Sequence, residues 1–235
     1  MNNSLSDLDL IRLQVETLFI HDQHGRIRAN NEPGHPPAPQ LFLGMTKEGT
    51  IWRFRHDLPD HAVRALEPLL ESIPVISAVH SGWINAPGIC AALQSYCAIS
   101  MIWNGPAYYF PTDLQSSADV VLITERNKEL LQAGFASAQA QLEAHQPCLA
   151  VVENGAAVAI CFSARISAHA AEAGIETLAS FRRRGYAART VASWATAVRN
   201  LGRLPLYSTS WNNLASQSVA QKLKLIPYGI DLSFI

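Results

Sequence analysis

The clearest chemical pattern in this chain is a run of three arginines between a strand-like stretch and a helix-like one. A strand is expected over 173–178, arginines occupy 182–184, and Gly185 opens a stretch with helical spacing over 185–200. The unpaired N–H groups at a helix start, reinforced by the helix dipole, bind anions such as phosphates. Nearby guanidinium groups strengthen such binding. The pattern predicts a pyrophosphate-binding turn, and it is equally typical of a solvated turn before an amphipathic helix.

The helix expected over 185–200 has one apolar face and a small-residue start. Gly185 lets the backbone approach a ligand closely, and Ala187 leaves the first turn uncrowded. The expected apolar face consists of Ala188, Val191, Ala192, Ala195 and Val198, whereas Arg189, Ser193 and Asn200 are expected to point away.

A second strand-to-helix junction follows later in the chain. Residues 206–209 are expected to form a strand and residues 214–223 a helix, and Asn213 stands where a helix cap is expected. A cap is the simpler interpretation of Asn213. Because two strand-to-helix junctions follow one another in this order along the chain, the sequence also favours a ligand-binding site.

Together the two junctions resemble the GNAT superfamily of acyl-CoA-dependent N-acetyltransferases. The family's Arg/Gln-x-x-Gly-x-Gly/Ala signature matches Arg-Arg-Arg-Gly-Tyr-Ala at 182–187. Its later Asn-x-x-Ala/Ser…Lys-Leu pattern matches 213–216 followed by Lys222-Leu223. The resemblance covers 118–235, and Ile-Glu-Thr at 175–177 looks like a subgroup of bacterial predicted acetyltransferases with a separate N-terminal domain.

The resemblance implies transfer of an acetyl group from acetyl-CoA, the cosubstrate, by direct attack of an amine on the thioester. The pantetheine arm of the family adds to the sheet beside 175–177, and the pyrophosphate binds at the turn that follows. The family's sheet splays between this strand and the one at 206–209, with the thioester in the split. No metal is implied. The positions that match cofactor-binding residues are Ile175, Thr177, Arg182, Arg183, Arg184, Gly185, Tyr186, Ala187, Ala188, Asn213 and Ser216.

Three positions depart from the family's usual catalytic pattern. Ala220 stands where many relatives carry a tyrosine general acid, Ser208 where some carry a glutamate, and Lys224 where a glycine is usual. An acid must therefore come from elsewhere in the chain, or solvent must protonate the leaving thiolate.

Glu176 is the carboxylate nearest the cofactor strand and is the expected catalytic base. A charge on the solvated face of that strand is the alternative interpretation. Tyr207 and Tyr228 are candidate hydroxyl groups, and burial as aromatic residues explains both equally well.

The departures leave a second function open, that of a non-catalytic module that binds or senses acyl-CoA. For the enzyme, the expected partner is a small-molecule or peptide amine, and a homodimer stays open. Neither nucleic acid nor membrane is an expected partner.

The elements that position this site divide the chain into two expected domains. Residues 118–235 form the GNAT-like domain, and 1–117 form an α+β domain that we expect to contribute to the acceptor site. The fold class is α/β, with a mixed sheet. Strands are expected over 18–21, 27–29, 41–45, 50–54, 120–123, 148–152, 156–162 and 228–234, and helices over 60–72, 89–101 and 125–144. Asn154-Gly155 predicts the hairpin turn between two of these strands.

The composition is that of a folded, charge-poor protein. Of 235 residues, 49% are apolar and only 16% charged, which excludes extensive disorder. Eighteen basic and 19 acidic residues leave a net charge of -1, unlike a general nucleic-acid binder. The four cysteines form no CxxC pair and are expected as buried small hydrophobes in a reducing compartment. With no signal peptide expected in 1–10, a cytoplasmic location is predicted.

Overall fold

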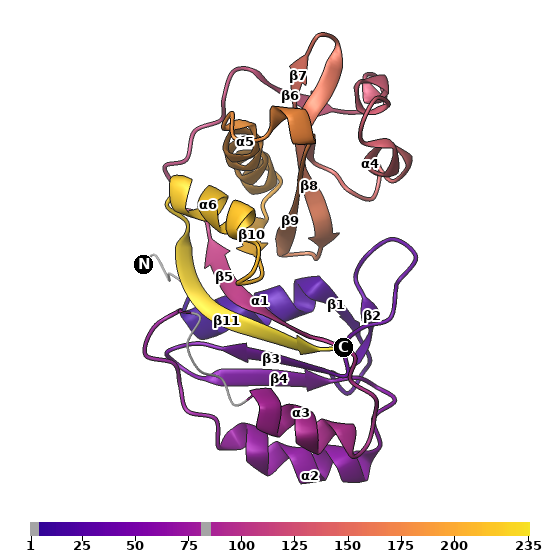
Figure 1. Ribbon diagram of the computed structural model, residues 1–235, viewed down its shortest axis with the longest axis vertical. Helices are drawn as coiled ribbons and strands as arrows, with labels where there is room; N and C mark the ends of the chain where they lie inside the picture. Colours follow the sequence, from indigo (N-terminus) through magenta and orange to yellow (C-terminus); the bar gives the residue numbers. More distant parts are fainter. Residues whose placement is uncertain (1–4, 81–85) are drawn as a thin grey trace. The chain divides into compact units, whose positions relative to one another are not determined.

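The protein, seen in a computed structural model, divides into two compact α/β units. The structure describes residues 5–80 and 86–235. The first unit contains Met1–Tyr108, Ser208–Leu214 and Pro227–Ile235, and the second contains Tyr109–Tyr207 and Ala215–Ile226 (Figure 1). Both units combine strands with packed helices, so the predicted mixed α/β class is confirmed. Within the described ranges, no helix has the length and apolar character needed to cross a membrane.

The first unit is built on four neighbouring strands in the order β4-β3-β11-β5. Strand β3 is antiparallel to both β4 and β11, and a separate hairpin pairs β1 with β2. Its elements are α1 (Asp7–Leu18), β1 (Phe19–His21), β2 (Ile27–Asn30), β3 (Leu41–Met45), β4 (Thr50–Phe54), α2 (Asp60–Glu71), α3 (Ala86–Gln94), β5 (Ile102–Tyr109) and most of β11 (Ile226–Phe234). The two hairpins and the helix expected over 60–72 are confirmed.

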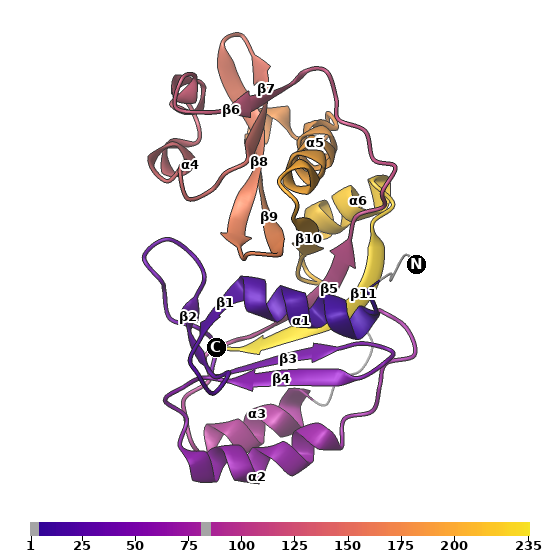
Figure 2. The ribbon, with the colours of Figure 1, turned by 180° about the vertical axis from the view of Figure 1, so that it is seen from behind.

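Helices cover both faces of this sheet (Figure 2). Alternate residues of β3 point to opposite faces, and Leu41, Leu43 and Met45 enter the core beneath α2 and α3. On the other face lies α1, a helix that was not predicted from the sequence. Ser6 starts this helix with a reciprocal capping pair to Asp9. The missed signal was that capping pair.

A buried polar chain ties α1 to β11. The Tyr228 hydroxyl donates to Gln14 Oε1 at 3.0 Å, and Gln14 Nε2 donates to Asp231 Oδ2 at 2.7 Å. All three side chains are buried. This arrangement supports the interpretation of Tyr228 as a core residue of the first unit.

The His21 imidazole is expected to make stability fall in mild acid. Burial lowers the pKa of His21, Arg53 adds to that effect, and Glu16 and Asp22 oppose it. The unfolded chain therefore takes up the proton first, so stability is lost as the pH falls below the unfolded pKa of about 6.5. Thermal denaturation from about pH 5 to 8 should show a flatter curve for His21→Gln. The exposed neighbour variant His24→Gln should keep the wild-type slope, and equal slopes in both variants would contradict this role.

The second unit has five strands in the order β10-β9-β8-β7-β6. Strand β10 is parallel to β9, and the other neighbours are antiparallel. Its elements are β6 (Val120–Ile123), η1 (Lys128–Leu131), α4 (Ala136–Ala140), β7 (Cys148–Glu153), β8 (Ala156–Ile166), β9 (Ala170–Thr177), η2 (Ala179–Phe181), α5 (Tyr186–Asn200), β10 (Leu204–Ser208) and α6 (Leu214–Lys222), of which Ser208 and Leu214 count with the first unit. The predicted β7–β8 hairpin is confirmed, with Asn154 and Gly155 at φ 50° and 77°.

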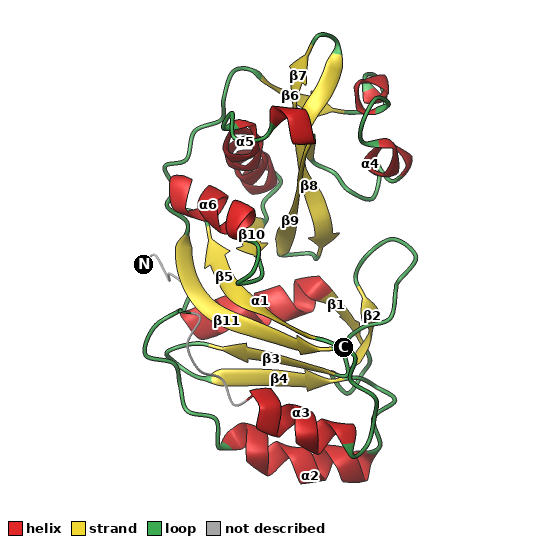
Figure 3. Cartoon of the chain, in the orientation of Figure 1, coloured by secondary structure: helices red, strands yellow, loops and turns green. Residues whose placement is uncertain are grey.

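The sheet of the second unit lies between α5 on one face and η1 with α4 on the other (Figure 3). Trp194 of α5 is fully buried, and its Nε1 donates to Ser163 Oγ of β8 at 3.1 Å. The predicted apolar face of α5 is buried throughout. Ser193 was expected to point away, which is wrong: it is buried, and its hydroxyl accepts the Ser117 N–H at 3.0 Å.

The single helix expected over 125–144 is also wrong. The chain forms the short 3₁₀ helix η1 and the five-residue helix α4 instead. Gly134, with its low helix propensity, lies between them. Leu131 and Phe135 still reach the core as the apolar spacing predicted, because a chain of turns can present the same side chains.

The cysteines are free thiols. Cys148 and Cys161 are buried as expected, whereas Cys90 and Cys97 are half-buried, so full burial was wrong for these two. Burial, with a contribution from the Glu176 charge, raises the pKa of Cys148 to about 12. That thiol therefore stays protonated and unreactive at neutral pH.

Candidate functional site

Strands β9 and β10 form a fork in the second unit. They pair only at Ala170↔Leu204, Ala171↔Pro205 and Glu172↔Leu206. Beyond Glu172, β9 continues on its other side against β8 as far as Thr177↔Ala159. In the described part of the chain, the edge of 173–177 that faces away from β8 has no strand partner. An extended ligand could add to this edge through backbone hydrogen bonds.

The predicted pantetheine positions lie on that open edge. Ile175, Glu176 and Thr177 are the last residues of β9. The Thr177 Oγ1 atom is buried, and it has no hydrogen-bond partner among the described residues. A buried hydroxyl is stabilised by a partner, so its position fits a polar group of a ligand beside β9.

The chain turns sharply from β9 into α5. Arg183 and Gly185 both have left-handed backbones, with φ 62° and 80°. Gly185 is the N-cap of α5, and no side chain caps this helix. The amides of Tyr186, Ala187 and Ala188 therefore open the helix without a side-chain acceptor, which is the arrangement that binds phosphate.

The three arginines surround this turn and are exposed. Arg182 Nε donates to the Thr177 carbonyl oxygen at 3.3 Å, which links the turn to the end of β9. Arg184 lies 5.0 Å from the centroid of the Phe181 ring and donates to the Ser180 carbonyl oxygen at 3.1 Å. These contacts use carbonyl oxygens and a ring, so the positive charges keep their capacity to attract an anion.

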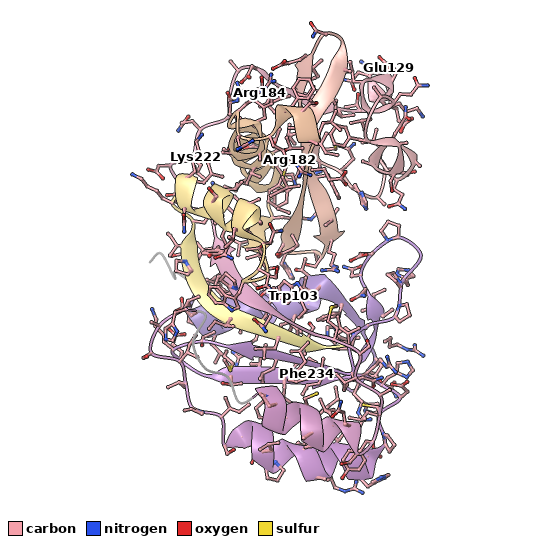
Figure 4. All side chains as sticks on the ribbon, in the orientation of Figure 1. Trp103, Glu129, Arg182, Arg184, Lys222 and Phe234 are labelled. Carbon is pink, nitrogen blue, oxygen red and sulfur yellow. The ribbon has the colours of Figure 1, made fainter. Side chains whose placement is uncertain are left out.

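A fourth cation lies at the same place and was missed by sequence reasoning. A Cβ atom on Gly185 would come within 2.9 Å of Lys222 Nζ, from the last turn of α6. The labelled side chains Arg182, Arg184 and Lys222 lie in the same part of the second unit (Figure 4). The Lys-Leu part of the later motif included Lys222, but its proximity to Gly185 depends on how α5 and α6 pack.

The nearby carboxylates already have cationic or hydroxyl partners. The Tyr186 hydroxyl donates to the Glu153 carboxylate. Arg189 stacks over the Tyr186 ring at 4.6 Å and forms an ion pair with Asp119. This network holds the first turn of α5 against the β7–β8 hairpin.

Two glutamates of β9 are candidates for proton transfer. Glu176, the predicted base, is exposed near the end of the strand. Glu172 is only 4% exposed and lies at the last pair before the fork, opposite Arg165 of β8. Alternation along a strand places both glutamates on one face. Glu172 was missed because only the pairing register reveals where the fork begins.

The remaining predicted residues lie around α6. Asn213 belongs to the first unit and immediately precedes this helix, with its N–H donating to the Ser210 carbonyl oxygen at 3.1 Å. Ser216 belongs to the second unit, where the Tyr207 hydroxyl contacts its carbonyl oxygen at 3.0 Å and its hydroxyl at 2.6 Å. Tyr207 is buried, and these two contacts of its hydroxyl group hold α6 in place.

The departures from the family pattern have structural counterparts. Ala220 is buried in α6, so no hydroxyl occupies that position. Lys224 has φ 53°, a conformation that glycine adopts with the least strain. Over the described ranges, no group of three His, Cys, Asp or Glu side chains could hold a metal ion.

One family model matches the second half of this chain. Residues 118–226 match the family model described as GNAT acetyltransferase. No curated protein matches this chain.

Several solved structures are similar to this chain at low sequence identity. A GNAT-family acetyltransferase from Colwellia psychrerythraea is 14% identical over 99% of this chain and 98% of that chain, with a TM-score of 0.49. One from Novosphingobium aromaticivorans is 16% identical over 58% of this chain and 65% of that chain, with a TM-score of 0.49. The aminoglycoside N-acetyltransferase AAC(6')-Iy in complex with CoA is 25% identical over 45% of this chain and 89% of that chain, with a TM-score of 0.37.

The family match spans β6 through α6, which includes both the fork and the uncapped start of α5. Through residues 118–226, this chain belongs to the GNAT acetyltransferase family.

Proposed function

We propose that this protein is an acetyl-CoA-dependent N-acetyltransferase that transfers the acyl group to an amine by direct attack on the thioester. The observation that carries the proposal is one continuous segment, in which the open edge of β9 leads through an arginine-rich turn to an uncapped helix start. These are the two features that a pantetheine arm and a pyrophosphate require.

Acetyl-CoA, as the cosubstrate, supplies the activated acyl group. The backbone of Ile175 and Thr177 would hold its pantetheine arm, and the amides from Arg183 to Ala188 would hold its pyrophosphate. The unpartnered Thr177 hydroxyl and the uncapped amides that follow Gly185 support this fit. We further propose that 118–235 form the transferase domain and that 1–117 contribute to the acceptor site.

The chain's own groups must then remove a proton from the amine and stabilise charge. Unpaired N–H groups on the open edge of β9 are suited to stabilise the oxyanion that forms at the thioester carbonyl. Because Ala220 has no hydroxyl and Tyr207 supports Ser216, we propose that solvent protonates the departing thiolate.

The proposal is tested by thiol release from acetyl-CoA over a panel of amines, with calorimetry of CoA binding alongside. The panel should contain amino sugars, amino acids, small amines and peptide N-termini. Turnover with at least one amine is expected. CoA binding without turnover would instead favour a non-catalytic acyl-CoA sensor, and an absence of CoA binding would contradict both functions.

The two β9 glutamates are distinguished by their effect on turnover. Because the phosphates would lie at the Gly185 end, the reacting thioester would lie toward the fork, beside Glu172 and farther from Glu176. We expect Glu172→Gln to lower kcat by about 100-fold or more. Glu176→Gln should lower kcat less than about tenfold. The reverse order would support Glu176, the base predicted from sequence.

A further inference from the structure

The two faces of β9 differ in how the helices of the second unit cover them. On one face, α5 packs against β7, β8 and β9, and Trp194 bonds Ser163 there. On the other face, the apolar cluster formed with η1 and α4 takes in residues of β6, β7 and β8 but, in the described part of the chain, none of β9. Because α5 blocks the first face, an acceptor would reach the open edge of β9 from the second.

Three residues of β9 point to this second face. Directly opposite residues of neighbouring strands share a face, and Gly174 pairs with Phe162 and Glu176 with Ile160, both of the cluster. Alternation along the strand places Glu172 on this face as well. The two glutamates are four residues apart, which corresponds to about 13 Å at a rise of about 3.3 Å per residue.

An apolar surface lies between the two glutamates. A Cβ atom on Gly174 would lie 2.6 Å from Cε2 and 2.7 Å from Cζ of Phe162, so the edge of this ring covers the strand there. His145 stacks on the same ring, with centroids 4.8 Å apart and planes 15° apart, and helps to hold it in place. Along β9 the face therefore presents a carboxylate, an aromatic edge suited to methylene groups, and a second carboxylate.

The two carboxylates differ in exposure. Glu172 is 4% exposed, lies where the fork begins and is opposite Arg165 of β8. Glu176 is exposed and forms no ion pair within the described ranges. Arg182 lies close by, but its Nε donates to the Thr177 carbonyl oxygen. Glu176 can therefore pair with a cation of a ligand without breaking a contact of the chain.

We propose that Glu176 binds a second cationic group of the acceptor, and that the acceptor is an elongated diamine or polyamine. This inference rests on the proposed function, in which the reacting amine lies beside Glu172 at the fork, and it goes further by naming the acceptor class. The methylene chain would cross the Phe162 edge, and the far ammonium group would pair with Glu176. A diamine too short for this span gains no contact with Glu176.

The test compares a four-carbon with an eight-carbon linear diamine as acceptors. Both carry two primary amines, but the shorter chain covers only about half of the distance between the glutamates. The measured quantity is kcat/KM for the long diamine divided by kcat/KM for the short one, because general effects on catalysis cancel in this ratio. We expect the wild type to favour the long diamine by at least about fivefold, the size of one exposed ion pair.

Two variants assign that preference to one carboxylate. Glu176→Gln should reduce the ratio by about fivefold. Glu129→Gln removes another exposed carboxylate, that of η1, and should keep the wild-type ratio.

An eight-carbon amino alcohol provides a second readout, which a merely structural glutamate would not move. It keeps the length of the long diamine and lacks the second charge, so the wild type should favour the diamine over it by about fivefold. Glu176→Gln should treat the two alike. In the wild type, this preference should fall as the ionic strength rises, because salt screens an exposed ion pair.

The outcomes separate this inference from the proposed function. If amines are turned over but Glu176→Gln keeps the length ratio, or Glu129→Gln lowers it equally, the acceptor class is wrong and the function stands. A wild type that prefers the amino alcohol would also overturn the inference. If no amine is turned over, calorimetry of the long diamine decides: binding that Glu176→Gln weakens supports the cation site while the function fails, and an absence of binding contradicts both.

Discussion

A Gly185→Glu chain is expected to lose about 100-fold or more in CoA affinity while remaining folded. Gly185 has φ 80°, and any Cβ there projects to within 2.9 Å of Lys222 Nζ. A glutamate would fill the space above the amides of α5 and bring a negative charge to the proposed pyrophosphate position. Because the nearest atom is the end of a flexible lysine, the fold itself can adjust. Calorimetry with CoA measures the effect.

Gly202→Glu is the matched control at the other end of the same helix. Gly202 has φ 75°, and nothing lies within 4 Å of where its Cβ would be. Both substitutions should therefore cost a similar backbone strain of about 1–2 kcal/mol, but only Gly185→Glu should impair CoA binding. Equal CoA affinities in the two variants would contradict the proposed pyrophosphate site at the start of α5.

A Gly105→Ala chain is expected to lose about 3 kcal/mol or more of stability. A Cβ at Gly105 would lie 1.7 Å from the Thr209 carbonyl oxygen and 2.8 Å from Ser210 Cα, which are backbone atoms that cannot rotate away. This steric clash can be removed only if β5 separates from 209–211. That movement would break the bonds from Thr209 N–H to Pro106 O (3.3 Å) and from Trp211 N–H to Asn104 O (3.2 Å).

Urea and thermal denaturation measure this loss against Gly49→Ala. At Gly49, a Cβ would meet only Leu8 side-chain atoms at 3.5 Å, an ordinary contact. This control should stay within about 1 kcal/mol of the wild type. A Gly105→Ala chain as stable as the control would show that 209–211 does not need this close approach.

Local signals predicted the elements of the site well. The predicted Asn154-Gly155 turn depends on the torsional preferences of these two residues. The apolar stripe of α5 depends on helical spacing alone, and each of its members is buried. Such features can be read without knowing which distant segments meet.

Elsewhere, local patterns were missed or were not sufficient. Over 125–144 the apolar spacing was compatible with one helix, yet the chain divides it around Gly134. Helix α1 was not predicted, although Ser6 and Asp9 have the spacing of a capping pair. Ser193 was predicted to face solvent. It is buried because its hydroxyl accepts a hydrogen bond from Ser117, and a contact between residues so far apart cannot be predicted from helical spacing.

By itself, the sequence determined the strand–turn–helix unit around Gly185 and the resemblance that the family match at 118–226 supports. Those features follow from torsional preference and spacing between near neighbours. Only the tertiary structure decided that β9 and β10 separate after Glu172, that Lys222 meets the start of α5, and that β11 lies mainly in the first unit. Each depends on strand register or helix packing between distant segments. The burial that drives such packing is non-directional, so no short pattern in the sequence specifies it.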